Sequence, residues 1–138
     1  MKFLLDSSAL FAHFFDEPGA DEVSALFHDP TAEILLSVLS APELFAALSV
    51  RGKGDRFDEV WRDYEQVVDD ILPVDEAVAL QAVALRRAAS RRVPNGDALI
   101  AAAAVLTGAM LIHRDPHFLS IPPNLLQQRS LTQKNPVL

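Results

Sequence analysis

The segment RRVPNGDALIAAAAVLTGAMLIHRDPHF, residues 91–118, places a long run of small apolar residues before a shorter apolar run. The long run begins at Asp97 and ends at Gly108, a residue that commonly terminates helices, so residues 97–108 are predicted to form a helix. The shorter run, residues 109–113, is too brief for a helix and is typical of a buried strand. A helix that leads into such a strand favours an α/β fold.

The same alternation of strands and helices extends over the rest of the chain. After residue 113 the chain is expected to be irregular, with prolines at 122, 123 and 136 and room for a last edge strand. This pattern predicts a three-layer α/β/α domain with a mainly parallel central sheet of four to five strands. The further predicted strands are residues 2–5, 32–39 and 71–74, and the further predicted helices are residues 8–15, 20–28, 40–52, 56–71 and 75–92.

Length and composition indicate a single domain over residues 1–138 with a packed core, because half of the residues are hydrophobic. The chain has no cysteine, which excludes a disulfide framework, thiolate metal sites and a cysteine nucleophile. No apolar segment reaches the roughly 18 residues of a membrane span, and Asp6 comes too early for a secretory signal. We therefore expect a soluble, cytoplasmic protein.

The formal net charge of −7 is distributed unevenly along the chain. Residues 1–85 carry five basic and 17 acidic side chains, whereas residues 86–138 carry seven basic and two acidic ones. An acidic protein is a poor candidate for a general nucleic-acid binder. The arginines of RRAASRR, residues 86–92, are either a solvated helix face or a local basic field for an anionic ligand.

Four acidic residues lie at predicted junctions between strands and helices. Asp6 ends the first strand, Glu43 lies in the first turn of the helix after the second strand, Asp97 begins a helix, and Asp115 follows the last clear strand. A parallel sheet gathers such junctions along one edge, where ligands bind. Each acid also has a structural explanation: helix capping, a capping box formed by Ser40 and Glu43, or a turn before proline.

If these carboxylates converge, they repel one another and require a cation to remain ionised together. Oxygen ligands select a hard divalent ion such as Mg²⁺, with Mn²⁺ as the alternative. Such an ion polarises a phosphoryl oxygen and lowers the pKa of a bound water, which then becomes the nucleophile. The chemistry that this pattern predicts is metal-assisted hydrolysis of a phosphate ester.

The segments LLDSSALFA, SAPELFAAL, PNGDALIAAAA and LIHRDPHF resemble, in this order, the PIN-domain ribonucleases, and most closely the VapC-type toxins of toxin–antitoxin pairs. The likeness covers nearly the whole chain. It implies a PIN-like fold and Mg²⁺-dependent hydrolysis of RNA that leaves a 5′-phosphate and a 3′-hydroxyl. It also implies a homodimer and a small antitoxin that covers the site and the early helices, with no membrane partner.

The resemblance assigns roles to the four acids. Asp6 and Asp97 match the principal Mg²⁺ ligands, and Glu43 and Asp115 match the residues that complete the site and orient water. Ser7 matches the small hydroxyl residue that follows the first acid.

Further residues are expected near the substrate. Asn95 is expected to line the same pocket, and Arg91, Arg92 and Arg114 are expected to contact RNA. His113 stands two places before the fourth acid, where the family often has a hydroxyl residue.

Two histidines, His113 and His117, are four residues apart, but Pro116 interrupts any helix between them, so a zinc site is not expected. The aromatic bulk of the first predicted helix has two explanations, core packing or a docking surface for a second copy or the antitoxin. The apolar residues concerned are Leu10, Phe11, Phe14 and Phe15.

Two other functions remain open from the sequence. The first is a PIN-domain nuclease that processes RNA without acting as a toxin. The second is an RNA- or protein-binding module in which the acidic site is idle.

Overall fold

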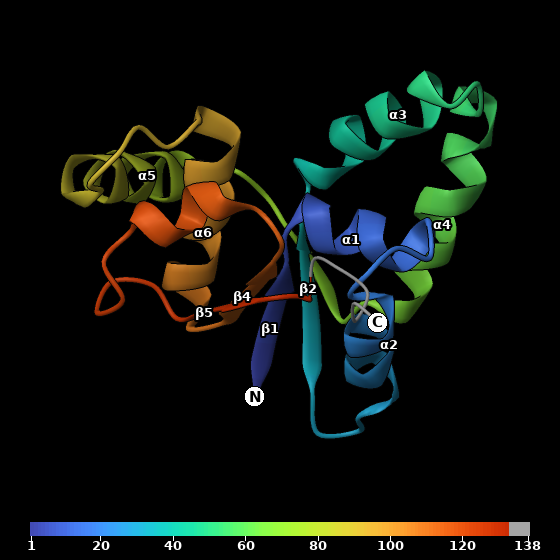
Figure 1. Ribbon diagram of the computed structural model, residues 1–138, viewed down its shortest axis with the longest axis horizontal. Helices are drawn as coiled ribbons and strands as arrows, with labels where there is room; N and C mark the ends of the chain where they lie inside the picture. Colours follow the sequence, from blue (N-terminus) through green and yellow to red (C-terminus); the bar gives the residue numbers. More distant parts are fainter. Residues whose placement is uncertain (133–138) are drawn as a thin grey trace, which may run out of the picture.

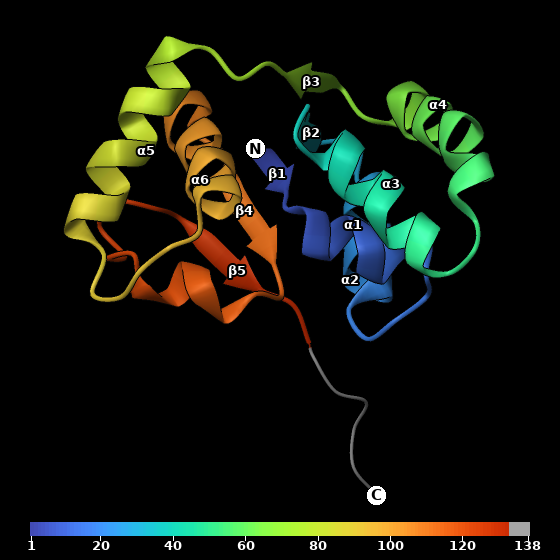
Figure 2. The same ribbon diagram turned by 90° about the horizontal axis from the view of Figure 1, so that it is seen from above.

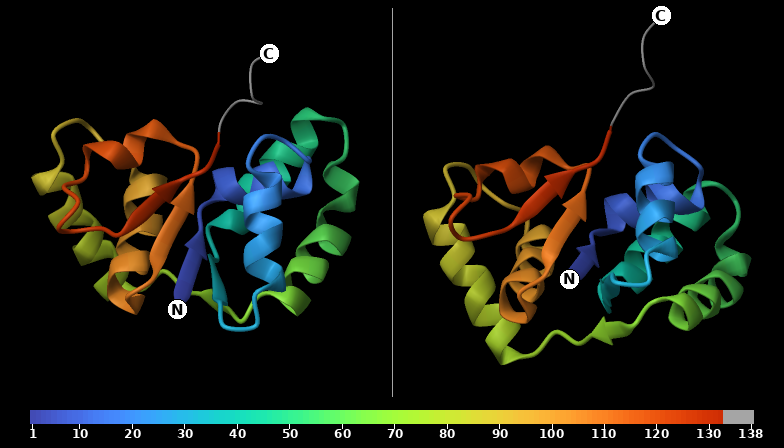
Figure 3. Two further views of the ribbon diagram at one scale, coloured as in Figure 1. Left: turned by 60° about the horizontal axis from the view of Figure 1, so that its bottom comes forward. Right: turned by 90° about the horizontal axis from the view of Figure 1, so that it is seen from below.

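The protein contains one five-stranded sheet in a computed structural model that describes residues 1–132 (Figure 1). The strands lie in the order β3-β2-β1-β4-β5, and every neighbouring pair is parallel. The predicted fold class is therefore confirmed, with a fifth strand at one edge of the sheet beside β4 (Figure 3). The strands are β1 (Lys2–Leu5), β2 (Glu33–Ser37), β3 (Asp70–Leu72), β4 (Met110–His113) and β5 (Gln128–Ser130).

Helices cover both faces of the sheet, as Figures 1 and 2 show. Two short 3₁₀ helices, η1 (Gly54–Arg56) and η2 (Pro116–Ser120), complete the described secondary structure. No helix within residues 1–132 combines the length and the apolar character that crossing a membrane requires. The helices on one face are α1 (Ser7–Phe14), α2 (Ala20–His28), α3 (Ser40–Val50) and α4 (Phe57–Val67), and those on the other are α5 (Glu76–Ala88) and α6 (Asn95–Thr107).

The central strands are apolar at successive positions because both of their faces are buried. In β1, Leu4 packs into the core beneath α5 and α6, whereas Phe3 and Leu5 pack into the core beneath α1 to α4. In β4, Leu111 and Ile112 divide between the two cores in the same way. This alternation explains why short uninterrupted hydrophobic runs predicted where the strands lie, although β2 and β3 each end two residues earlier than expected.

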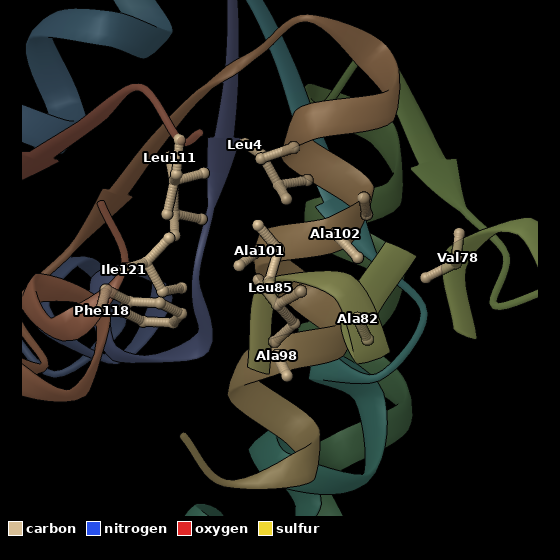
Figure 4. Close-up of a cluster of buried hydrophobic side chains, with 14 of the residues drawn as sticks. Leu4, Val78, Ala82, Leu85, Ala98, Ala101, Ala102, Leu111, Phe118 and Ile121 are labelled. Carbon is tan, nitrogen blue, oxygen red and sulfur yellow. The ribbon is translucent and has the colours of Figure 1, made fainter. Parts of the chain in front are cut away.

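The alanine-rich α6 lies close to its neighbours because its packed face consists of small residues. Ala98, Ala101 and Ala102 are fully buried, and α5 contributes Ala82 and Leu85 to the same cluster (Figure 4). Close packing of this kind leaves no room for a longer side chain. The position of α6, and of Asp97 in its first turn, therefore depends on these alanines.

Two predicted helices end four residues earlier in the structure than expected. The helix expected over 56–71 ends at Val67, because Asp69 bonds Ile34 on β2 through both its backbone N–H (2.8 Å) and its carboxylate (2.7 Å). The helix expected over 75–92 ends at Ala88, and the backbone N–H of Ser90 donates to Ser120. Both ends depend on contacts that are distant in the sequence. The prediction of an irregular tail also covered residue 136, which lies outside the described residues.

The aromatic residues of the first helix belong mainly to the core. Leu10 is fully buried, and Phe11, Phe14 and Phe15 pack against the cluster between the sheet and α1 to α4. This supports core packing for these residues, while the docking surface suggested by the sequence stays a prediction because the three phenylalanines are only partly buried.

We expect Ala101→Leu to lower the free energy of unfolding by roughly 1–3 kcal/mol, because the added carbons must fit into a closely packed cluster. Urea unfolding followed by circular dichroism measures this change. Ala79→Leu on the exposed side of α5 makes the same substitution and should change stability by less than about 0.5 kcal/mol. Equal effects at both positions would contradict the packing described for α6.

Candidate active site

The four acids predicted from the sequence converge near the carboxyl ends of β1 and β4. From β1 the chain proceeds to β2 and β3 on one side, and β4 returns to the other side of β1. In parallel sheets such a reversal of strand order creates a crevice where ligands bind. Asp6 directly follows β1, and Asp115 lies two residues after β4.

Asp6 is both a helix cap and a buried acid. The residue is 3% exposed, and its Oδ2 accepts hydrogen bonds from the backbone N–H (3.0 Å) and hydroxyl (2.5 Å) of Ser8 at the start of α1. Burial raises the pKa of Asp6, and the charge of Asp115 adds to the increase, although both hydrogen bonds from Ser8 oppose it. The capping interpretation is therefore confirmed without removing Asp6 from the site.

Glu43 is held by a residue from another helix. Its Oε1 accepts a hydrogen bond from the hydroxyl of Ser7 (2.9 Å), whose oxygen also lies 2.9 Å from that of Ser40. Helix α3 begins after Leu39 and has no side-chain cap, so the capping box suggested by the spacing of Ser40 and Glu43 is not formed. Burial raises the pKa of Glu43, and the charges of Asp6 and Asp115 raise it further.

Asp97 and Asp115 both contact the same nitrogen of an imidazole ring. Nδ1 of His117 is 3.2 Å from Oδ2 of Asp97 and 2.9 Å from Oδ1 of Asp115. Asp115 also caps η2, because the same Oδ1 accepts a hydrogen bond from the backbone N–H of His117 (2.9 Å). This turn brings the imidazole back to the carboxylate two residues before it.

The charges of the other three acids act on Asp97. Burial, followed by the charges of Asp6, Asp115 and Glu43, raises the pKa of Asp97 to about 7, while His117 opposes this rise. Carboxylates arranged in this way hold a cation readily, because it relieves their mutual repulsion. Ligand atoms of Asp97, Asp115 and His117 lie within 4.8 Å of one another, which fits a divalent ion.

His117 and Ser8 belong to this site but were not predicted to do so. The sequence did contain a signal for His117, since Asp-Pro-His after a strand places a side chain two residues beyond a turn-forming aspartate. In the sequence, His113 and His117 draw attention only as a possible zinc pair four residues apart, which Pro116 argues against. The two imidazoles have different partners: Nε2 of His113 lies 2.8 Å from Oε1 of Gln128, whereas Nδ1 of His117 contacts Asp97 and Asp115.

His113 is fully buried and supports the site through a hydrogen bond with the backbone of Asp115. Its Nδ1 accepts a hydrogen bond from the backbone N–H of Asp115 (3.1 Å), so in the neutral ring the proton is on Nε2, 2.8 Å from Oε1 of Gln128. Burial lowers the pKa of His113. His113, which stands where the family often has a hydroxyl residue, thus fixes the backbone of Asp115.

The remaining predicted residues lie around the acids. Asn95 is exposed at the start of α6 and accepts a hydrogen bond from Arg86. Arg91 and Arg92 are exposed on the connection between α5 and α6. The guanidinium of Arg114 forms an ion pair with Glu17, outside the acidic cluster. Roles for these residues in substrate binding stay predictions.

Residues 3–122 match the model of the PIN domain family, so the chain belongs to this family and the resemblance seen in its four segments is confirmed. Among curated proteins, no match to the chain was found.

Solved structures support the fold. A chain of VapBC2 from Rickettsia felis, bound to promoter DNA, is 18% identical with a TM-score of 0.75, covering 95% of this chain and 99% of that one. A chain of a toxin–antitoxin complex from Klebsiella pneumoniae is 25% identical with a TM-score of 0.66, covering 86% and 92%. A chain of VapBC-5 from Mycobacterium tuberculosis is 24% identical with a TM-score of 0.66, covering 94% and 98%.

The raised pKa of Asp97 predicts that, in the absence of divalent ions, the free energy of unfolding decreases as the pH rises. Its folded value of about 7 exceeds the ordinary value of 3.8, so its stabilising contribution is present below pH 3.8 and is lost as the pH rises through 7. We expect Asp97→Asn to raise the free energy of unfolding by roughly 1–3 kcal/mol at pH 8.

Urea unfolding in chelator at pH 4 and pH 8 tests this, with Asp63→Asn on the exposed side of α4 as the charge-matched control. The increase in the free energy of unfolding caused by Asp97→Asn should be smaller at pH 4 than at pH 8. A stability difference that does not change with pH would show that carboxylate repulsion is not its source.

Proposed function

We propose that this protein is a divalent-metal-dependent endoribonuclease that acts as the toxin of a type II toxin–antitoxin pair. The observation that carries this proposal is the convergence of four carboxylates, each from a different junction, whose charges act on one another. Repulsion of this kind disfavours a purely structural role, because caps and turns do not require the acids to be close together. Membership of the PIN-domain family supports the nuclease activity that the sequence resemblance implies.

The proposed cofactor is Mg²⁺, with Mn²⁺ as the alternative. When bound, a divalent ion polarises a phosphoryl oxygen and makes an attacking water more acidic. Asp6 and Asp97 are the proposed principal ligands. Glu43, fixed by the hydroxyl of Ser7, and Asp115, fixed through its backbone by His113, are proposed to complete the site and orient the water. Cleavage of the P–O bond leaves a 5′-phosphate and a 3′-hydroxyl.

The proposed partners follow from the resemblance and from the similar solved structures. These structures include VapBC and other toxin–antitoxin complexes, which supports a small antitoxin as the partner of this chain. A homodimer and a cytoplasmic RNA substrate complete the proposal. The exposed Arg91 and Arg92 are suited to contact the phosphate backbone, since basic side chains supply most of the affinity for nucleic acids.

We expect Asp97→Asn to reduce the rate of RNA cleavage in Mg²⁺ by more than about 100-fold, because it removes a charged ligand at nearly constant volume. Cleavage of a labelled RNA pool by purified protein measures the effect, and Asp63→Asn should retain the wild-type rate. In cells without the antitoxin, the wild type should arrest growth and the Asp97 variant should not. Cleavage by Asp97→Asn at the wild-type rate would refute the catalytic assignment.

His117 allows a separate prediction about metal preference. Its Nδ1 contacts both Asp97 and Asp115, so we infer that it contributes a nitrogen ligand to the proposed ion. Imidazole favours Ni²⁺, whereas Mg²⁺ prefers oxygen ligands. We expect His117→Gln to weaken Ni²⁺ binding by about 10-fold or more while leaving Mg²⁺ binding nearly unchanged.

Isothermal titration of the two metals measures this difference, with His28→Gln on the exposed surface of α2 as the control. A gain in affinity for both metals would instead show that the imidazole only occupies the place of the ion.

A further inference from the structure

Ser40 is a buried polar residue that does not form the capping box suggested by its spacing with Glu43. Helix α3 has no side-chain cap, yet Ser40 is 0% exposed and its hydroxyl oxygen lies 2.9 Å from that of Ser7. Removing a hydroxyl group from water costs free energy unless a hydrogen bond replaces the contacts with water. The partner of the Ser40 hydroxyl is therefore Ser7, which is also buried.

The direction of these hydrogen bonds is fixed when Glu43 is ionised. A carboxylate only accepts hydrogen bonds, so the hydroxyl of Ser7 donates to Oε1 of Glu43 (2.9 Å). Ser7 has a single hydroxyl proton, and this bond uses it. The hydroxyl of Ser40 is therefore the donor in the contact with Ser7. The three groups form a chain of hydrogen bonds from Ser40 through Ser7 to the carboxylate of Glu43.

This chain joins the beginnings of two helices that carry acids of the site (Figure 1). Ser7 is the first residue of α1 and directly follows Asp6, whereas Ser40 is the first residue of α3 and precedes Glu43 by three positions. Residues three positions apart lie on the same side of a helix, so Ser40 and Glu43 can both reach Ser7. The contact between the two hydroxyls thus connects the helix start that holds Glu43 with the helix start that follows Asp6.

We propose that Ser40 is a positioning residue that directs the hydroxyl of Ser7 towards Glu43 and so holds this carboxylate ready for a divalent ion. This inference rests on the metal binding proposed above. It adds to the site a residue that acts through Ser7 and not through the ion itself.

Two effects make the Ser40 hydroxyl important for Glu43. Donation from Ser40 keeps the proton of Ser7 on the side of the carboxylate, and hydrogen bonds in a chain strengthen one another. Glu43 has a long side chain, and holding it in one orientation costs rotamer entropy. When Ser7 already holds the carboxylate, less of this entropy is lost on binding an ion. Partners that orient metal ligands commonly change metal affinity for this reason.

The test is isothermal titration of the full-length chain with Mn²⁺. We expect Ser40→Ala to raise the Kd for Mn²⁺ by about 3- to 10-fold, because Glu43 loses part of its fixed orientation. Ser49→Ala makes the same substitution at an exposed position of α3 and should leave the Kd unchanged.

A double-mutant cycle with Ser7→Ala shows whether Ser40 acts through Ser7. Without the Ser7 hydroxyl, the chain to Glu43 is already broken, so adding Ser40→Ala should not raise the Kd further. A general disturbance of α3 would instead weaken Mn²⁺ binding to the same extent in both backgrounds.

The outcomes separate this inference from the function on which it rests. An unchanged Kd in Ser40→Ala, with normal binding in the wild type, would overturn the role of Ser40 and leave the metal site standing. The same loss of affinity with and without the Ser7 hydroxyl would also overturn it. If the wild type did not bind Mn²⁺, the proposed metal site and this inference would both be wrong.

Discussion

The repulsion among four carboxylates near the carboxyl ends of the parallel strands is the constraint on which the site depends. Burial and neighbouring charges raise the pKa of Asp6, Glu43 and Asp97, so keeping these groups together as anions costs free energy. Hydroxyl groups offset part of this cost, because Ser7 bonds Glu43 and Ser8 bonds Asp6. The remaining charge is what gives the cluster its affinity for a cation.

The fold supplies further compensation through its helices. Asp6 caps α1, Glu43 lies in the first turn of α3, and Asp97 lies in the first turn of α6. The positive ends of three helix dipoles are therefore placed next to carboxylates. This arrangement follows from a parallel sheet whose strand order reverses at β1, and close packing of the α6 alanines maintains it. The sheet therefore places the helix N-termini beside the carboxylates, and the helix dipoles stabilise their negative charge.

The sequence predicted those features that depend on local pattern. Short apolar runs gave the strands, helical spacing gave the helices, and the position of Asp6 after a strand placed it at the correct edge. Features set by distant contacts were missed. Helix α4 ends where Asp69 pairs with Ile34, and Glu43 bonds Ser7 instead of forming a box with Ser40. Periodicity contains no information about such partners.

His113 and His117 are only four positions apart, but the first has a structural role and the second faces the acidic site. The ring nitrogens of His113 both serve the fold, one through the backbone of Asp115 and the other through Gln128 on β5. The amide of Gln128 also donates to the carbonyl of Phe118 (2.9 Å), which joins the edge strand to η2. A buried neutral imidazole thus fixes the turn that presents Asp115 and His117. His113, which stands where the family often has a hydroxyl residue, therefore connects β5 to Asp115. The edge strand β5 thus helps to hold the site in place.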